Sequence, residues 1–284
     1  MFTYIKLNHD NQFSDFNNKA YKFKQTIVNE PLTSLDNLKD LILRLPSKQV
    51  YASSSKVSIN ANLDTAHKEH KIKCSLEHAL ENLEHSDSFI MVRNPETDDQ
   101  YKEIFTHLKN DLELLASKLG TKITDSTLYL FITSPNGTTP YHIDRYSTFL
   151  MQLCGNKDVH TWVPWDKKQI TDHELETYMA KTHKEAPTLK EGFLKTSTIT
   201  RITPGEGVHI PFLAPHMVKT NDTVSASISI IFNTNETRKK SLSLNFNELI
   251  HRKFGFRLKP VIKKKTFSDS IKMFLYRLVM KLSR

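Results

Sequence analysis

Two histidines and one carboxylate form the pattern with the clearest chemical meaning in this chain. His142 and Asp144 stand two residues apart, and His216 follows later, after the turn-forming segment Pro-Gly-Glu-Gly at 204–207. Two imidazoles and one carboxylate on one face of Fe(II) leave positions open for a chelating acid and for dioxygen. The sequence therefore predicts a non-haem iron centre whose ligands are His142, Asp144 and His216.

A histidine two residues before an acid is a weak signal by itself. With 13 His and 31 acidic residues in 284 positions, about 1.4 such matches are expected by chance, and the chain holds four. The three that begin at His67, His85 and His183 lie in polar or helix-like surroundings, which favour a solvated face. Only the match at His142 has neighbours that could build a pocket.

Those neighbours are predicted strands and turns. Residues 127–133 are β-branched and aromatic, which is typical of a buried strand, and 134–137 form a turn signal. Since residues two apart in a strand point to the same face, His142 and Asp144 are expected to face one pocket while Ile143 points away.

Three further segments complete the predicted core. Residues 147–153 and 159–163 flank Gly155 and predict a hairpin. Residues 224–232 alternate small polar with apolar side chains, as a strand with one cavity-lining face does.

In motif order and spacing, residues 125–235 resemble the cupin-type JmjC hydroxylases, and most of all the asparaginyl hydroxylase that acts on hypoxia-inducible factor. The likeness rests on Thr-Pro-Tyr-His-Ile-Asp at 139–144, Gly-Asn-Lys at 155–157, and 204–211 before His216. It implies a mainly β fold with helical additions, a double-stranded β-helix or jelly-roll barrel that binds Fe(II) and 2-oxoglutarate.

The resemblance also assigns a cosubstrate anchor. Lys157 matches the position that pairs with the distal carboxylate of 2-oxoglutarate, and Thr139 matches the one that gives this carboxylate a hydroxyl. A lysine inside a barrel is costly without an anion, so an acidic ligand is its natural partner.

The chain departs from this family near the metal. Where the asparaginyl hydroxylase has an asparagine on the last core strand, this chain offers Ile231, with Ser227 and Ser229 as the nearest polar side chains. Because the first 120 residues show no matching substrate motif, the substrate stays open between a protein side chain and a small molecule.

The predicted organisation has three parts. Residues 1–120 form a helical and extended region packing on the barrel, 121–240 the JmjC-like cupin core, and 241–284 a basic helical tail. Helices are expected at 34–45, 76–83, 98–119 and within 166–191, and a strand at 88–93. The histidines of the 166–191 insertion, His173 and His183, are expected to face solvent.

All of the net charge of +9 lies in the tail. Residues 1–240 carry 29 Lys/Arg and 29 Asp/Glu, whereas 241–284 carry 11 Lys/Arg and two acids. Helices are predicted at 242–256 and from the capping pair Ser268-Asp269 to Leu282, the second with an apolar stripe beside basic residues. Four roles remain open for this tail: docking on its own domain, forming a homodimer through these helices, binding an anionic membrane, and binding nucleic acid. Packing on protein is favoured.

Composition narrows the function classes. No run of about 18 apolar residues and no leader-like start is present, so a cytoplasmic soluble protein is expected. Cys74 and Cys154 form neither a metal motif nor a disulfide framework. The sequence thus predicts an Fe(II)- and 2-oxoglutarate-dependent dioxygenase, a hydroxylase. An N-demethylase on the same fold, or a non-catalytic cupin sensor or scaffold, are the alternatives.

Overall fold

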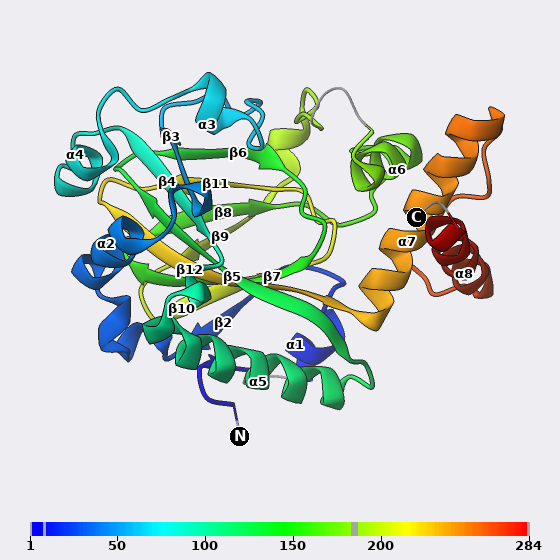
Figure 1. Ribbon diagram of the computed structural model, residues 1–284, viewed down its shortest axis with the longest axis horizontal. Coiled ribbons are helices and arrows are strands. Elements are labelled where there is room, and N and C mark those ends of the chain that lie inside the picture. The colour runs from blue at the N-terminus through cyan, green and yellow to red at the C-terminus, as the bar shows by residue number, and fades with distance from the viewer. Residues whose placement is uncertain (1, 8–9, 183–186, 283–284) are drawn as a thin grey trace.

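Two antiparallel sheets, with helices outside them, make up the computed structural model, which describes residues 2–7, 10–182 and 187–282 (Figure 1). The larger sheet has eight strands in the order β1-β2-β10-β7-β12-β5-β4-β3. These are β1 Ile5–Lys6, β2 Tyr21–Gln25, β10 Glu206–Ile210, β7 Ser147–Cys154, β12 Ser225–Thr234, β5 Ile123–Thr133, β4 Ser88–Arg93 and β3 Val50–Ser54. The smaller sheet has the order β6-β11-β8-β9. Its strands are β6 Thr138–His142, β11 His216–Thr220, β8 Lys157–Thr161 and β9 Thr198–Ile202.

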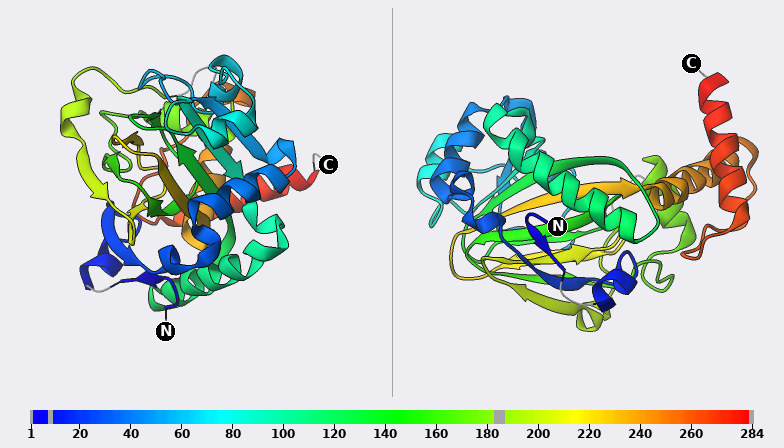
Figure 2. Two further views of the ribbon diagram at one scale, coloured as in Figure 1. Left: turned by 90° about the vertical axis from the view of Figure 1, so that its left-hand side faces the viewer. Right: turned by 90° about the horizontal axis from the view of Figure 1, so that it is seen from below.

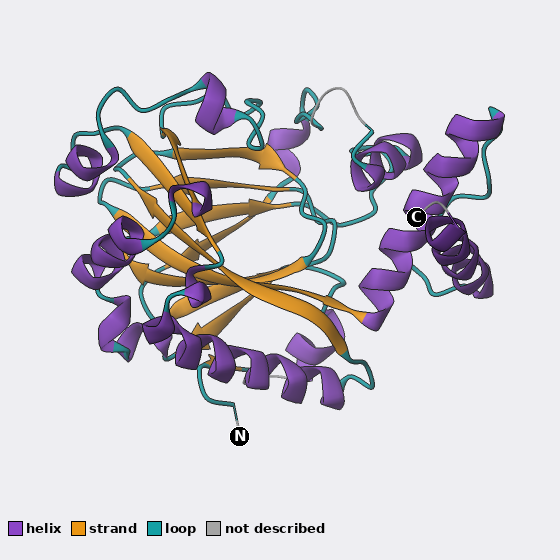
Figure 3. Ribbon diagram, in the orientation of Figure 1, coloured by secondary structure: helices purple, strands orange, loops and turns teal. Residues whose placement is uncertain are grey.

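Eight α-helices surround the sheets (Figure 3) within the described residues. They are α1 Asp10–Asp15, α2 Leu35–Arg44, α3 Ala66–Glu69, α4 Leu76–Glu81, α5 Lys102–Lys118, α6 Asp172–Ala180, α7 Asn235–Phe254 and α8 Phe267–Leu282. The predicted helices near 34–45, 76–83 and 98–119, and the strand at 88–93, are confirmed. A mainly β core with helical additions is therefore the observed architecture.

The larger sheet has one face in the main core and one face toward the smaller sheet. On its outer face, α5 buries Ile104, Leu108 and Leu112 at the spacing of one helix face. On β12, Ile228 and Ile230 join this core. The alternate residues Ser227, Ser229 and Ile231 instead line a pocket between the sheets, which confirms the predicted cavity-lining face of this strand.

The predicted hairpin around Gly155 is wrong. β7 and β8 belong to different sheets, so the chain crosses from one sheet to the other at this turn. Gly155 has φ +64, and a Cβ there would lie 2.2 Å from the carbonyl oxygen of Val224. A glycine turn between two strand-like segments fits a crossover as well as a hairpin, and only long-range pairing of β7 with β10 and β12 decides between them.

The tail begins as a direct continuation of the sheet. α7 follows β12 without a gap, and α8 lies beside α7 on the side away from most of the sheets (Figure 2). α8 starts at Phe267, earlier than predicted. The cap is formed by Thr266 and Asp269, since each backbone N–H donates to the other's side chain at 3.1 and 3.2 Å. Of the predicted capping pair Ser268-Asp269, Asp269 is therefore correct, and its partner is Thr266 and not Ser268.

α8 turns its polar side inward. Its buried residues are Asp269 and Lys272, and Asp269 forms an ion pair with buried Lys240 of α7 at 2.6 Å. The predicted apolar stripe is exposed, with Phe274 at 64% and Leu282 at 79%. The hypothesis that this stripe docks on its own domain is therefore wrong for the residues described.

Among the helices of the described ranges, none is both long and apolar enough to cross a membrane. The cellular compartment stays a prediction.

Candidate metal centre and adjoining pocket

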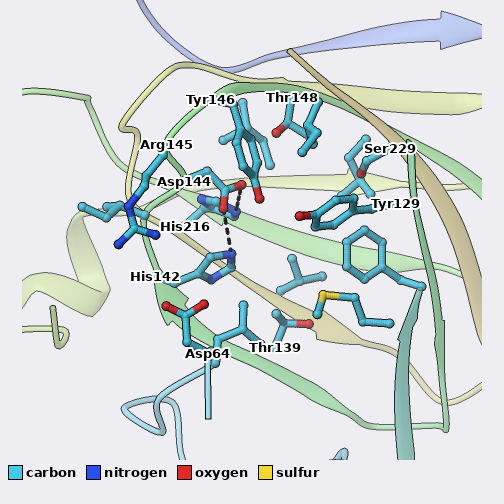
Figure 4. A pocket seen from close by; sticks show the side chains of 18 of the residues that line it. Asp64, Tyr129, Thr139, His142, Asp144, Arg145, Tyr146, Thr148, His216 and Ser229 are labelled. Atoms are coloured by element: carbon cyan, nitrogen blue, oxygen red, sulfur yellow. Dashed lines mark ion pairs between the residues drawn. The ribbon is translucent and has the colours of Figure 1, made fainter. Parts of the chain in front are cut away.

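The three predicted ligands meet at one end of the smaller sheet. His142 ends β6 and His216 begins β11, and the two residues are paired across these strands. Asp144 follows just beyond β6, with carboxylate oxygens 3.9 Å from Nε2 of His142 and 3.6 Å from Nε2 of His216 (Figure 4). One donor atom from each of the three lies within 4.8 Å of the others. Strand pairing thus brings together residues that are 74 positions apart in the sequence.

Backbone carbonyls fix which nitrogen each imidazole offers. Nδ1 of His142 lies 2.8 Å from the oxygen of Pro140, and Nδ1 of His216 lies 3.0 Å from that of Ala214. Because a carbonyl only accepts, each Nδ1 carries the proton and each Nε2 presents its lone pair toward Asp144. In this tautomer Nε2 is the nitrogen that remains to bind a metal.

Burial shifts the pKa values of His216 and Asp144. Burial, and next the nearby His142, hold the pKa of His216 well below its ordinary value, so its imidazole is neutral. Burial raises the pKa of Asp144, against the opposing effect of His142. A divalent cation would favour the ionised carboxylate and neutral imidazoles, so this donor set fits such an ion.

A cavity of about 540 Å³ opens from the three ligands into the space between the sheets. Lys157 and Thr139 both line it, although Lys157 is only 4% exposed. Its Nζ donates to Oγ of Ser227 at 2.8 Å. Lys157 is in none of the ion pairs found among the described residues, and burial lowers its pKa to about 7. The pocket therefore holds a buried amine that lacks an anionic partner from the described chain.

Several lining residues escaped the sequence analysis. Tyr129, Tyr146 and Asp64 border the cavity (Figure 4). Tyr129 could have been found, since it shares a strand face with Phe131, two residues on. Asp64 reaches the site from a segment whose position depends on tertiary packing, which no local pattern reports.

α6 supports the loop that carries Asp144. Arg145 donates from Nε and Nη2 to the carbonyl of Tyr178 at 3.0 and 2.7 Å, and the hydroxyl of Tyr178 donates to the carbonyl of Ile143. Ile143 is fully buried in an apolar cluster with residues of α6. The insertion after β8 therefore braces the metal-ligand loop.

Of the two insertion histidines, His173 is exposed on α6 as predicted, and His183 lies outside the described residues. His209, in the segment before His216, is fully buried and its Nδ1 lies 3.0 Å from the carbonyl oxygen of Thr148. It is a core histidine outside the pocket.

Residues 7–238 match the family described as the cupin-like domain. This chain therefore belongs to the cupin-like domain family, and the resemblance to cupin-type proteins is confirmed. No match was found among curated proteins.

Solved structures of YcfD from Escherichia coli are similar in fold. An X-ray structure of it is 16% identical, covers 98% of this chain and 69% of that chain, and has a TM-score of 0.53. A second, described as the ribosomal oxygenase YcfD, is 16% identical over 98% and 68% of the chains, with a TM-score of 0.50. A third, in complex with cobalt and succinic acid, is 15% identical over 97% and 68%, with a TM-score of 0.50. At these identities the likeness concerns the fold.

Proposed function

We propose that this protein is an Fe(II)- and 2-oxoglutarate-dependent dioxygenase that hydroxylates its substrate. One observation carries the proposal: buried Lys157, without an acidic partner among the described residues, faces the cavity that also holds the donor atoms of His142, Asp144 and His216. A cavity that offers a metal donor set and a buried cation suits a ligand that chelates metal at one end and carries a carboxylate at the other.

The protein's own groups then have separate tasks. His142, Asp144 and His216 would hold the iron, and Lys157 and Thr139 would bind the distal carboxylate of 2-oxoglutarate. Bound iron supplies oxygen chemistry in which 2-oxoglutarate and dioxygen yield succinate, carbon dioxide and a hydroxylated substrate. The cavity lies between the two sheets, and Arg145 with Tyr178 keeps the Asp144 loop in place.

The succinic acid and cobalt in the YcfD complex support this proposal. Succinic acid is a dicarboxylic acid, as the proposed cosubstrate is, and cobalt is a divalent ion that accepts the same ligand types as iron. The description of YcfD as a ribosomal oxygenase favours a protein side chain as the substrate class here, with a small molecule as the other.

For the fold, we propose that the two sheets form the double-stranded β-helix of the JmjC type, with residues 121–240 as its core. Residues 1–120 pack on that core and 241–284 form the basic tail. The outer-face helices α2 and α5, which share one apolar core with the larger sheet, support this division.

The decisive experiment measures succinate formation by purified protein supplied with iron, 2-oxoglutarate and candidate substrates. We expect oxygen-dependent succinate release in the wild type and none in Asp144→Ala. Mass spectrometry of proteome and metabolites, with and without the protein, should show a mass gain of one oxygen on the substrate. Formaldehyde release would instead identify an N-demethylase. A protein that binds iron but never consumes 2-oxoglutarate would be a sensor or scaffold.

We also propose a homodimer through the C-terminal helices. The tail carries many exposed apolar side chains among the described residues, namely Phe254, Phe256, Ile262, Phe267, Ile271, Phe274, Leu275, Leu278, Met280 and Leu282. A second copy would cover them with a surface of the same kind, and a membrane or nucleic acid is the less favoured partner.

A further inference from the structure

A second group of metal-type donors lies where α6 meets α7, outside the pocket. His173 of α6, with Glu248 and His251 of α7, places one donor atom each within 4.8 Å of the others. Glu248 and His251 are three residues apart and so share one face of α7. The rings of His173 and His251 have centroids 5.7 Å apart. Two imidazoles and one carboxylate thus converge from two helices.

Glu248 gives this group its second, independent feature. It is only 3% exposed. Its Oε1 accepts a hydrogen bond from Oγ1 of Thr182 at 2.9 Å, but its Oε2 has no hydrogen-bond partner among the residues that the structure describes. Among the residues that the structure describes, the basic atom paired with Oε2 is Nδ1 of His251, at 4.0 Å. A buried carboxylate oxygen in this position needs a cation, because leaving it without one is costly.

We propose that His173, Glu248 and His251 bind a divalent transition-metal ion, with Zn²⁺ as the ion that fits best. Zinc takes imidazole nitrogen and carboxylate oxygen in tetrahedral geometry at about 2.0–2.2 Å, so that its ligand atoms lie about 3.3–3.6 Å apart. The 4.0 Å between His251 and Glu248 is close to this spacing, and His173 is exposed on its helix and free of the core. A small rotation of the His173 side chain would bring its ring nitrogen to the same ion, and a water molecule would take the fourth coordination position.

Such an ion would tie α6 to α7. The two helices already meet through an apolar cluster that includes Leu175 and Leu244 and through the buried hydrogen bond from Asn247 to Glu176 at 2.6 Å. α6 also carries Tyr178, whose hydroxyl and carbonyl hold the loop of Asp144. The second ion therefore stabilises the helix that braces the first site. This proposal does not depend on the reaction proposed above.

The test counts zinc equivalents on tag-free, metal-stripped protein by titration against a chromophoric chelator. We expect two equivalents for the wild type and one for His142→Ala/His216→Ala, whose remaining ion sits at the second site. His173→Ala/His251→Ala should also bind one, and the combination of all four substitutions none. The exposed pair His78→Ala/His85→Ala, as matched control, should keep both.

Glu248→Gln checks the same site without a change in side-chain size. Glutamine can still accept from Thr182, so we expect the fold, followed by circular dichroism, to persist while the second equivalent is lost. Zinc should also raise the thermal midpoint of His142→Ala/His216→Ala, and adding His173→Ala/His251→Ala should abolish that rise. The proposal is overturned if His142→Ala/His216→Ala takes up no zinc. It is also overturned if the four-fold variant or Glu248→Gln keeps the second ion, because that ion would then be bound elsewhere.

Discussion

Lys157 of β8 donates a hydrogen bond to Ser227 of β12 across 2.8 Å, and this contact joins the two sheets inside the pocket. Neither residue is exposed beyond 4%. A hydroxyl is a neutral partner and leaves the charge of an ammonium uncompensated, which is why burial alone brings the pKa of Lys157 down to about 7. The pair is therefore poised to accept an anion.

Lys157→Met should remove the cosubstrate anchor and spare the metal. Losing a buried charge partner costs about 3–5 kcal/mol, so affinity for 2-oxoglutarate should fall by about 100-fold or more while iron affinity stays nearly unchanged. Calorimetry with nickel as an inert substitute for iron measures both. Lys219→Met, an exposed lysine of β11, is the control and should bind normally; unchanged affinity in Lys157→Met would move the anchor elsewhere.

The same lysine predicts a pH dependence of cosubstrate binding. In the free protein the pKa of Lys157 is about 7, and a bound carboxylate would raise it toward the ordinary range. Above pH 7 the free lysine is increasingly neutral, so binding must take up a proton and weakens by up to about tenfold for each pH unit. Below pH 7 the lysine is already charged and affinity should level off.

Calorimetry of 2-oxoglutarate binding in buffers of different ionisation enthalpy gives the proton uptake directly. We expect close to one proton at pH 8.5 and little at pH 6. Lys157→Met should show a flat profile for this step. A wild type that takes up no proton at pH 8.5 would mean that Lys157 is not the group that meets the carboxylate.

Asp144→Asn should abolish tight iron binding, because the amide keeps the shape of the carboxylate but supplies no charge. His142→Ala should do the same by removing a donor. Iron content after anaerobic loading and desalting checks both variants, with His85→Ala, an exposed histidine, as control. Full iron content in either variant would exclude this donor set as the metal centre.

Much of this site could be read from local sequence, and the reason lies in β-strand geometry. Ser227 and Ser229 needed only the alternation of β12 to be assigned to the pocket. Asp144 was assigned to the same face as His142 by that alternation, but it lies just beyond the end of β6, so the loop and not the strand places its carboxylate. Pairing of His142 with His216 across β6 and β11 was not visible in either segment. Motif order predicted only that both histidines bind one metal, and the strand register now shows that they are paired.

The parts that failed depend on contacts far along the chain. The path at Gly155 is decided by β10 and β12, and no local residue distinguishes a hairpin from a crossover. α8 has an amphipathic pattern, yet the ion pair of Lys240 with Asp269 orients its polar side inward. The proximity of His173 on α6 to Glu248 on α7 was likewise not predictable. In the sequence, His173 is only an exposed histidine on a charged helix.

Gly155→Ala should destabilise the protein severely. Its φ of +64 disfavours any residue with a Cβ, and that atom would also meet the Val224 carbonyl oxygen at 2.2 Å. Gly120 has nearly the same φ, +65, but no atom within 4 Å of the added Cβ. Gly120→Ala should thus cost about 1 kcal/mol from the backbone alone, and Gly155→Ala clearly more, about 3 kcal/mol or above. Urea unfolding of both variants measures the difference; equal losses would show that the Val224 contact has no energetic weight.

The apolar face of α8 predicts self-association that point substitutions can test without unfolding the tail. Removing α8 altogether would strip buried Lys240 of its ion-pair partner Asp269, so truncation would confuse stability with association. Phe274→Glu/Leu278→Glu changes only exposed side chains, which are 64% and 44% accessible.

Sedimentation of the full-length protein should give a dimer, and Phe274→Glu/Leu278→Glu should give a folded monomer with an unchanged thermal midpoint at low concentration. Arg277→Glu, an exposed basic residue on the same helix, alters charge but not apolar area and should remain dimeric. Two results together would make this face a membrane contact. Arg277→Glu alone would change the association of the protein, and the wild type would bind anionic vesicles at low salt but not in 0.5 M salt, where the Debye length is about 4 Å. A wild type that is monomeric at about 50 µM, roughly the range in which weak dimers form, would contradict the dimer.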